Sequence, residues 1–213
     1  MKIIAHRGYW NQNIESNSPL AIRTALEHGY GFESDVRDYA ERMVISHNIA
    51  TSSSQDAEEV FQWLHEFEDK YCFAINIKAD GLKDILKSFF DTYSIANYFL
   101  FDMSIPQMVE FREMGLRFFT RQSEVEPNPN MYEEAAGVWI DGFWNTDWIT
   151  KELLDNHIKN GKEICLVSPE LHSKENYKEF WQKLVDDEID LNKVILCTDY
   201  PDEAKEFFYG KKN

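Results

Sequence analysis

The chain has 213 residues, and its 38 Asp and Glu residues outnumber its 22 Lys and Arg residues, giving a formal net charge of −16. An acidic protein of this kind repels polyanions, so nucleic acid and anionic membrane surfaces are excluded as first candidates for a partner. Hydrophobic residues make up 43% of the chain and aromatic residues 15%, which favours one domain with a large core over a disordered chain.

Short apolar runs alternate with amphipathic segments along the chain. Eight of these runs are expected to be strands, and they begin at Lys2, Gly31, Cys72, Tyr98, Leu116, Gly137, Glu163 and Val194. A further apolar run, residues 43–47, lies close behind the second strand. Apolar residues at helical spacing predict helices over residues 19–28, 56–69, 82–93, 106–114, 150–160, 174–188 and 202–209. Ser54 is the expected N-cap of the second helix.

This alternation predicts an α/β protein with a parallel sheet and helices outside it. Eight strand–helix units favour a closed (β/α)8 TIM barrel that forms a single compact domain over residues 1–213. Each strand–helix unit must be short, because about 250 residues is typical of that fold. An open sheet of the Rossmann type is the alternative, although no GxGxxG motif follows the first strand.

The location of the protein is inferred from its apolar runs and its cysteines. No run approaches the about 20 apolar residues of a membrane-spanning helix, so we expect no stable membrane insertion. The first apolar run is too short for a secretory signal. Cys72, Cys165 and Cys197 lie far apart in apolar runs and are expected to be buried thiols. These features predict a cytoplasmic protein, and they leave its oligomeric state open.

Polar and charged side chains gather where the expected strands end. Because a (β/α)8 barrel carries its chemistry at the carboxyl ends of its strands, these residues are the candidates for a functional site. The main candidates, from the first strand to the third, are His6, Arg7, Glu33, Asp35, His47, Asn76, Lys78 and Asp80. Taken singly, most such residues are ordinary surface or structural residues, so the prediction rests on their common location.

The chemistry of this set points to a phosphate ligand and a metal ion. Glu33 and Asp35 alternate along one strand face and offer oxygen ligands to a hard cation, Mg²⁺ or Ca²⁺. Arg7 and Lys78 can neutralise phosphate oxygens.

Four further residues extend this site. His6 and His47 are suited to move protons near neutral pH, as a general acid and a general base. Arg121 and Trp144 follow later strands and are candidate contacts for a substrate head group. Together these features predict a metal-assisted phosphate site.

Several motifs, in this order, resemble those of the glycerophosphodiester phosphodiesterase family. They are His6-Arg7-Gly8, Asn17-Ser18, Glu33-Ser34-Asp35-Val36, Val44-Ile45-Ser46-His47, Ile75-Asn76-Ile77-Lys78 and Thr198-Asp199-Tyr200-Pro201-Asp202. The resemblance implies a TIM-barrel enzyme that hydrolyses phosphodiesters with a divalent metal. It implies that a hydroxyl group neighbouring the ester attacks phosphorus and that water opens the cyclic phosphate. By position, it makes His6 and His47 the acid–base pair, Glu33 and Asp35 metal ligands, and Arg7 and Lys78 phosphate ligands.

The sequence departs from the family pattern at several points. Asn76 stands where the family has a third metal-binding Glu, so we expect weaker metal binding, and Asp80 is a candidate replacement. Asn48 replaces the Asp after the second His, and Ser16 replaces the Glu of the family's ENT-type turn. Residues 49–55 replace a longer family insertion, which predicts a more open substrate pocket.

These departures leave two alternatives to an active enzyme of this family. One is a catalytically weakened or inactive relative that binds a phosphorylated ligand. The other is a relationship to the sphingomyelinase D enzymes, which share the arrangement of His, Glu-x-Asp and His without the insertion. Those enzymes are secreted and contain disulfides, whereas this sequence indicates neither feature.

Overall fold

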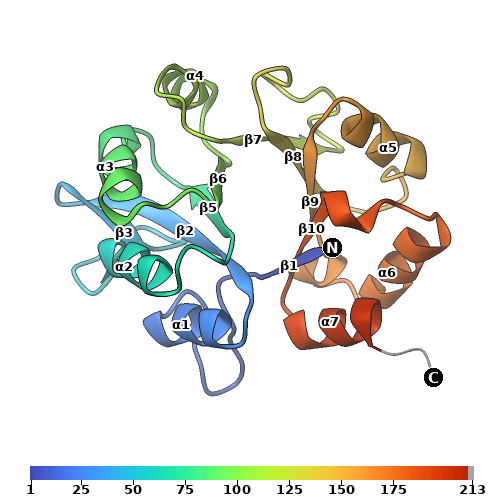
Figure 1. Ribbon diagram of the computed structural model, residues 1–213, viewed down its shortest axis with the longest axis horizontal. Coiled ribbons are helices and arrows are strands. Elements are labelled where there is room, and N and C mark those ends of the chain that lie inside the picture. Colours follow the sequence, from blue (N-terminus) through green and yellow to red (C-terminus); the bar gives the residue numbers. More distant parts are fainter. Residues whose placement is uncertain (211–213) are drawn as a thin grey trace. The chain divides into compact units, whose positions relative to one another are not determined.

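The computed structural model describes residues 1–210, which form two compact units (Figure 1). The N-terminal unit spans Ile4–Phe118, and the C-terminal unit combines Met1–Ile3 with the chain from Phe119 onward. Both units contain parallel strands and helices, which confirms the predicted α/β class. The prediction that residues 1–213 are a single domain stays a prediction.

The N-terminal unit is built around the long strand β2, which pairs in parallel with β1 and β5, while β5 pairs with β6. These strands are β1 (Lys2–Ala5), β2 (Gly31–Tyr39), β5 (Phe73–Ile77) and β6 (Tyr98–Phe101). An antiparallel extension follows the end of β2 and consists of β3 (Arg42–Ile45) and β4 (Gln55–Asp56). Neighbouring helices contact each other in chain order, namely α1 (Pro19–Glu27), α2 (Glu58–Glu66), α3 (Lys83–Tyr93) and α4 (Ile105–Glu113).

The C-terminal unit repeats the same alternation. Its parallel strands are β7 (Phe119–Ser123), β8 (Gly137–Asp141), β9 (Glu163–Val167) and β10 (Val194–Thr198). Its helices are α5 (Lys151–Lys159), α6 (Tyr177–Asp186) and α7 (Pro201–Tyr209), with two short 3₁₀ turns at Pro169–His172 and Leu191–Lys193. Trp181 is fully buried in the core of this unit.

The sequence explains where most helices begin. The Ser18 side chain accepts a hydrogen bond from the backbone N–H of Ala21, which caps α1. The predicted cap at Ser54 is wrong. Gln55 and Asp56 pair with β3 as a short strand, so α2 begins only at Glu58, and the Ser54 hydroxyl instead accepts a hydrogen bond from the backbone of Thr51.

The prediction that the strands close into a (β/α)8 barrel stays a prediction. Within the N-terminal unit, one isolated bridge pairs Leu100 of β6 with Phe118. The expected fifth strand, starting at Leu116, begins only at Phe119, so the extended residues before it form this bridge instead of a ladder.

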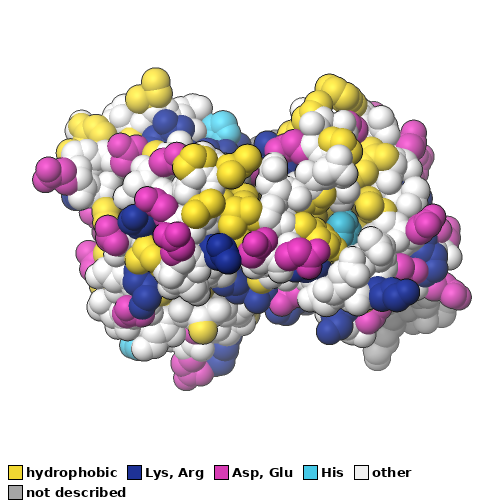
Figure 2. Space-filling model, turned by 90° about the horizontal axis from the view of Figure 1, so that it is seen from above, with side chains coloured by type: hydrophobic (Ala, Val, Ile, Leu, Met, Phe, Trp, Pro, Cys, Tyr) yellow, Lys and Arg dark blue, Asp and Glu magenta, His cyan; other side chains and the backbone are white. Residues whose placement is uncertain are grey.

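The surface is mixed in charge on the face drawn in Figure 2, where acidic and basic side chains are interspersed on each unit. No helix within residues 1–210 is both long enough and apolar enough to cross a membrane.

Candidate active site

Two carboxylates are buried in the middle of the N-terminal unit. Glu33 and Asp35 lie two residues apart on β2, and they are only 2% and 1% exposed. Most other residues in the buried strands of this unit are apolar, as expected for strands covered on both faces. A buried carboxylate is costly unless partners compensate its charge, so the surroundings of this pair indicate what it does.

Three side chains compensate the charge of Asp35. The Asn17 amide donates a hydrogen bond to Oδ2 of Asp35 at 2.7 Å. Nε of Arg7 lies 3.5 Å from the same oxygen, and Nζ of Lys78 lies 3.3 Å from Oδ1. Both oxygens of Asp35 therefore face positive or hydrogen-bond-donating groups, and the two cations predicted to bind phosphate meet at this carboxylate.

Glu33 has fewer partners. The backbone N–H of Arg7 donates to Oε2 of Glu33 at 3.1 Å, and Nε2 of His6 lies 3.9 Å from that oxygen. Burial raises the pKa of Glu33 to about 7, and the negative charge of Asp35 adds to this rise. His6 and Arg7 lower the pKa but do not cancel the effect of burial. Glu33 is therefore poised to gain or lose a proton near neutral pH.

The turn after β1 orients the backbone N–H of Arg7 toward Glu33. Arg7 and Gly8 both have a positive φ, of 56° and 82°. A Cβ atom on Gly8 would lie 2.6 Å from the backbone carbon of Ala21 in α1, so this close approach requires glycine. The His-Arg-Gly motif thus has a local steric reason as well as a chemical one.

Asn17 is a site residue whose role the sequence analysis did not identify. Its backbone N–H donates to the carbonyl of Arg7 at 2.8 Å, and its side chain holds Asp35. The Ser34 hydroxyl donates to Oδ1 of Asn17 at 2.7 Å, which fixes the orientation of the amide. The available indication was an Asn just before a helix, since Asn tolerates the left-handed φ of 59° found here.

Asn76 has a buried oxygen without a hydrogen-bond partner. Asn76 pairs in register with Asp35 across β2 and β5, and its Oδ1 atom is buried and unpartnered. Together with Glu33, these residues supply two carboxylates and one amide oxygen, a donor set that fits Mg²⁺ or Ca²⁺. Within residues 1–210, no group of three or more His, Cys, Asp or Glu side chains is arranged to hold a metal ion.

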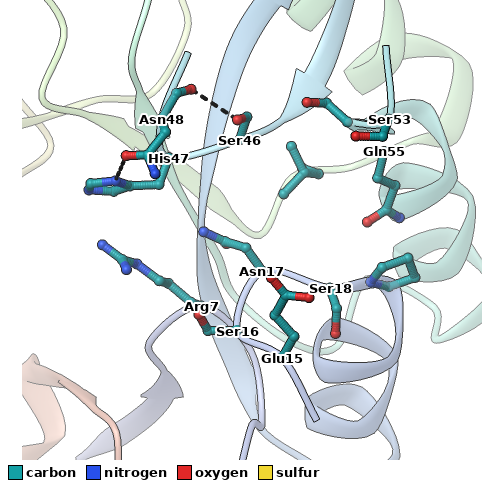
Figure 3. Close-up of a pocket in the computed structure, with 13 residues that line it drawn as sticks. Arg7, Glu15, Ser16, Asn17, Ser18, Ser46, His47, Asn48, Ser53 and Gln55 are labelled. Carbon is teal, nitrogen blue, oxygen red and sulfur yellow. Dashed lines mark hydrogen bonds between the residues drawn. The ribbon is translucent and has the colours of Figure 1, made fainter. Parts of the chain in front are cut away.

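His47 borders a cavity of about 390 Å³ that Arg7 also lines (Figure 3). Nδ1 of His47 lies 3.1 Å from Oδ1 of Asn48. In the tautomer that carries the proton on Nδ1, His47 donates to Asn48, and its Nε2 atom is left as an acceptor. Asn48 can therefore orient His47, although it lacks the charge of the Asp that the resemblance implied.

Three other candidate residues have partners outside this cluster or belong to the other unit. Asp80 accepts a hydrogen bond from the Ser104 hydroxyl at 2.6 Å, and no hydrogen bond or ion pair joins it to Glu33 or Asn76. Arg121 and Trp144 belong to the C-terminal unit. Arg121 forms an ion pair with Glu126, with 2.6 Å between Nε and Oε2, and Trp144 is 67% exposed. Their role as head-group contacts stays a prediction.

The C-terminal unit carries polar groups that the sequence analysis did not single out. Nε2 of His172 lies 2.6 Å from Oδ1 of the buried Asp141. Burial raises the pKa of Glu170, which accepts hydrogen bonds from the hydroxyls of Ser168 and Thr198. His172 and Glu170 lie in a 3₁₀ turn after β9, where the sequence offers no motif that would mark them.

Known structures resemble this fold over almost its whole length. A glycerophosphodiester phosphodiesterase from Parabacteroides distasonis has a TM-score of 0.73 and 15% identity, with 96% of this chain and 95% of the other covered. One from Agrobacterium tumefaciens has a TM-score of 0.67 and 15% identity, with 97% and 98% covered. A glycerophosphoryl diester phosphodiesterase from P. distasonis has a TM-score of 0.71 and 15% identity, with 97% and 85% covered. No protein-family model and no curated protein sequence matches the chain.

Proposed function

We propose that this protein is a phosphodiesterase that hydrolyses a small phosphodiester, such as a glycerophosphodiester, in its N-terminal unit. The observation that carries the proposal is the convergence of Arg7 and Lys78 on Asp35, beside Glu33 and His6. The fold similarity and the ordered motifs support the same reaction class. Since the sequence identity to the solved structures is low, the residues of the site carry the chemical argument.

Arg7 and Lys78 are the expected ligands of the phosphate group. Their side chains are 30% and 22% exposed, so both can reach a bound ligand while they remain beside Asp35. Asp35 holds the two cations at one place, which reduces the conformational entropy lost when a phosphate binds. The guanidinium group of Arg7 can form two parallel hydrogen bonds to phosphate oxygens.

His6 and His47 are the proposed acid–base pair. His6 lies beside Glu33, whose negative charge, when present, favours the protonated imidazole and so a general acid. His47 borders the cavity, and its hydrogen bond with Asn48 leaves Nε2 as a proton acceptor in one tautomer. In the reaction implied by the family resemblance, one histidine takes the proton of the attacking hydroxyl and the other protonates the leaving alcohol.

Glu33, Asp35 and Asn76 are the proposed holders of a divalent cation, Mg²⁺ or Ca²⁺. The unpartnered Oδ1 atom of Asn76 supports this assignment, because a buried acceptor without a donor is costly. A bound cation supplies Lewis-acid stabilisation of the negative phosphate oxygens. With only two carboxylates in the set, we expect weaker binding than at a site with three.

Removing either histidine tests the acid–base assignment. We expect His6→Ala and His47→Ala each to lower the rate of phosphomonoester release from a glycerophosphodiester by about 10²–10⁴-fold, the usual contribution of a general acid or base. The assay contains Mg²⁺ or Ca²⁺, and His65→Ala on α2 is the matched control. If either site variant hydrolyses as fast as the control, its histidine is not part of the catalytic pair.

A non-catalytic phosphate-binding protein is the second candidate. It is favoured by the two cations that already compensate Asp35 without a metal ion. Calorimetry with glycerol 3-phosphate, with and without Mg²⁺, separates the two. Tight binding that needs no metal, together with no hydrolysis of a diester, would establish the binding protein.

A further inference from the structure

Arg37 continues the face of β2 that carries the two buried carboxylates. Side chains two residues apart point to the same side of a strand, so Glu33, Asp35 and Arg37 share one face. The backbone N–H of Lys78 donates to the carbonyl of Val36 at 2.9 Å, which extends the parallel pairing of β2 with β5 by one residue. Lys78 therefore lies beside Arg37 in register, and the two cations are neighbours on this face.

The positive charge of Arg37 is uncompensated among the described residues. Arg37 is half-buried, and its Nε atom is buried without a hydrogen-bond acceptor. Within residues 1–210, Arg37 takes part in no ion pair, whereas Arg7 and Lys78 both lie against Asp35. A buried donor without an acceptor is costly. The chain has 38 acidic side chains against 22 basic ones, so acidic partners are not in short supply.

Arg7 carries a second donor without an acceptor. Its Nε atom is also buried, and although this atom lies 3.5 Å from Oδ2 of Asp35, it has no hydrogen-bond partner among the described residues. Arg7 and Arg37 therefore each present a buried N–H with unused hydrogen-bonding capacity. A phosphoryl group has several charged oxygen atoms and supplies the acceptors that both arginines lack.

An extra cation discriminates between phosphoryl groups of different charge. Coulomb energy is proportional to the charge of the ligand, so one added cation stabilises a dianion about twice as strongly as a monoanion. A phosphodiester carries a single negative charge. When a hydroxyl attacks its phosphorus, the new O–P bond forms, the hydroxyl proton passes to a histidine, and the phosphoryl oxygens gain a second negative charge. The phosphomonoester product also carries about −1.5 to −2 at pH 7.

We propose that Arg37 is a third phosphoryl-binding cation, which favours the dianionic phosphoryl group of the transition state and of the phosphomonoester product over the monoanionic diester. This inference rests on the proposed function and makes Arg37 a catalytic residue. Interactions that are stronger in the transition state than in the bound substrate raise kcat, whereas equal interactions in both states change only KM. The position of Arg37 beside Lys78 supports contact with the same phosphoryl group.

Steady-state kinetics and calorimetry on Arg37→Gln test this inference with the full chain. In Mg²⁺ or Ca²⁺, we expect Arg37→Gln to lower kcat/KM for a glycerophosphodiester by about 10–100-fold, with at least half of the logarithmic loss in kcat. In the same buffer, the Kd of glycerol 3-phosphate should rise by a similar factor. Arg37→Lys keeps the charge and should restore most of both losses. Arg42→Gln removes the same charge from the exposed end of β3 and is the matched control.

The division of the loss between kcat and KM decides the outcome. A loss confined to KM would mean that Arg37 binds the diester and the transition state alike, which would overturn the inference. Equal losses in Arg37→Gln and Arg37→Lys, or in Arg37→Gln and Arg42→Gln, would also overturn it. Urea unfolding should show Arg37→Gln to be at least as stable as the wild type, because an unpaired buried donor stabilises nothing. A less stable Arg37→Gln would assign Arg37 a structural role instead.

Failure of the proposed function gives a different result. If the wild type hydrolyses no diester, the assigned reaction is wrong, and calorimetry with glycerol 3-phosphate then tests Arg37 alone. Weaker binding to Arg37→Gln than to Arg42→Gln upholds the third cation. Equal binding to the two variants, or no binding to the wild type, excludes it.

Discussion

At the scale of single residues, the central feature is a pair of buried carboxylates with unequal surroundings. Asp35 has an amide and two cations against its oxygens, whereas Glu33 has one backbone N–H and a histidine at 3.9 Å. Burial raises the pKa of Glu33 to about 7, and the negative charge of Asp35 adds to the rise. A buried carboxyl group with a raised pKa is typical of a functional site.

The raised pKa of Glu33 predicts how stability depends on pH. The folded state keeps the proton up to about pH 7, whereas the unfolded chain loses it near pH 4.5. The stability that this group contributes is therefore present below about pH 4.5 and is lost as the pH rises through 7. Relative to Glu33→Gln, the wild type should lose on the order of 3 kcal/mol of unfolding free energy over this window.

Urea unfolding at several pH values, with EDTA present, measures this difference. Glu113→Gln, which removes a carboxylate from the exposed surface of α4, is the control. A constant difference between the wild type and Glu33→Gln from pH 4.5 to 8 would show that Glu33 is ionised throughout.

Asn76→Glu is expected to strengthen metal binding. The substitution restores a third carboxylate in register with Asp35, so the affinity for Mg²⁺ or Ca²⁺ should rise by about tenfold or more. Calorimetric titration with each metal measures it. Asn13→Glu adds the same charge on an exposed loop and should leave the metal affinity unchanged. An equal gain in affinity in both variants would mean that the added negative charge, and not its position at residue 76, causes the effect.

The sequence predicted that several charged side chains of the site lie close together, while their chemical roles stay predictions. Spacing alone placed Glu33 and Asp35 on one face, and the structure brings Arg7 and Lys78 to them. The role of Asn17 was not predictable, because its contact with Asp35 depends on a left-handed turn between β1 and α1. The hydrogen bond between Asp80 and Ser104 was not predictable either, because the two residues are 24 positions apart in sequence.

At the scale of elements, β2 positions the site because three strands pair with it. Its start pairs with β1, its middle with β5 and its end with β3. Glu33 and Asp35 lie in the middle segment, where consecutive residues of β2 pair in parallel with consecutive residues of β5. The carboxylates are therefore fixed by backbone hydrogen bonds as well as by their own partners.

The antiparallel pairing of β2 with β3 shows why some elements escaped prediction. Ala40 and Glu41 both have positive φ values, of 48° and 64°, which is the conformation of a two-residue type I′ hairpin turn. Such turns normally carry Asn-Gly or Asp-Gly, so this pair gave no turn signature. By contrast, β1, β6 and β9 begin at the predicted residues, because short apolar runs mark them clearly.

Gly8→Ala is expected to disturb the contact between α1 and the turn after β1. A Cβ atom at Gly8 would lie 2.6 Å from the backbone of Ala21 and would have an unfavourable φ, so the unfolding free energy should fall by about 2–4 kcal/mol. Chemical denaturation measures the change. Gly115→Ala separates the two causes, since Gly115 has a φ of 68° but no atom within 4 Å of the added Cβ. Equal losses in both variants would mean that the close approach to α1 is unimportant.

At the scale of the whole molecule, the proposed machinery is concentrated in one unit. The candidate acid–base, phosphate and metal residues all belong to the N-terminal unit. The net charge of −16 excludes long polyanions but not a small anionic diester, because Arg7 and Lys78 contact Asp35 and His6 lies beside Glu33.

Phosphorus NMR of a glycerophosphodiester incubated with the protein tests the central claim most directly, because it follows the diester and every phosphorus-containing product together. With Mg²⁺ or Ca²⁺ present, the account predicts that the wild type converts the diester signal into a phosphomonoester signal. The variant carrying both His6→Ala and His47→Ala should leave the diester intact over the same time. A diester signal that persists with the wild type in both metals, or that disappears equally fast with the double variant, would contradict the account.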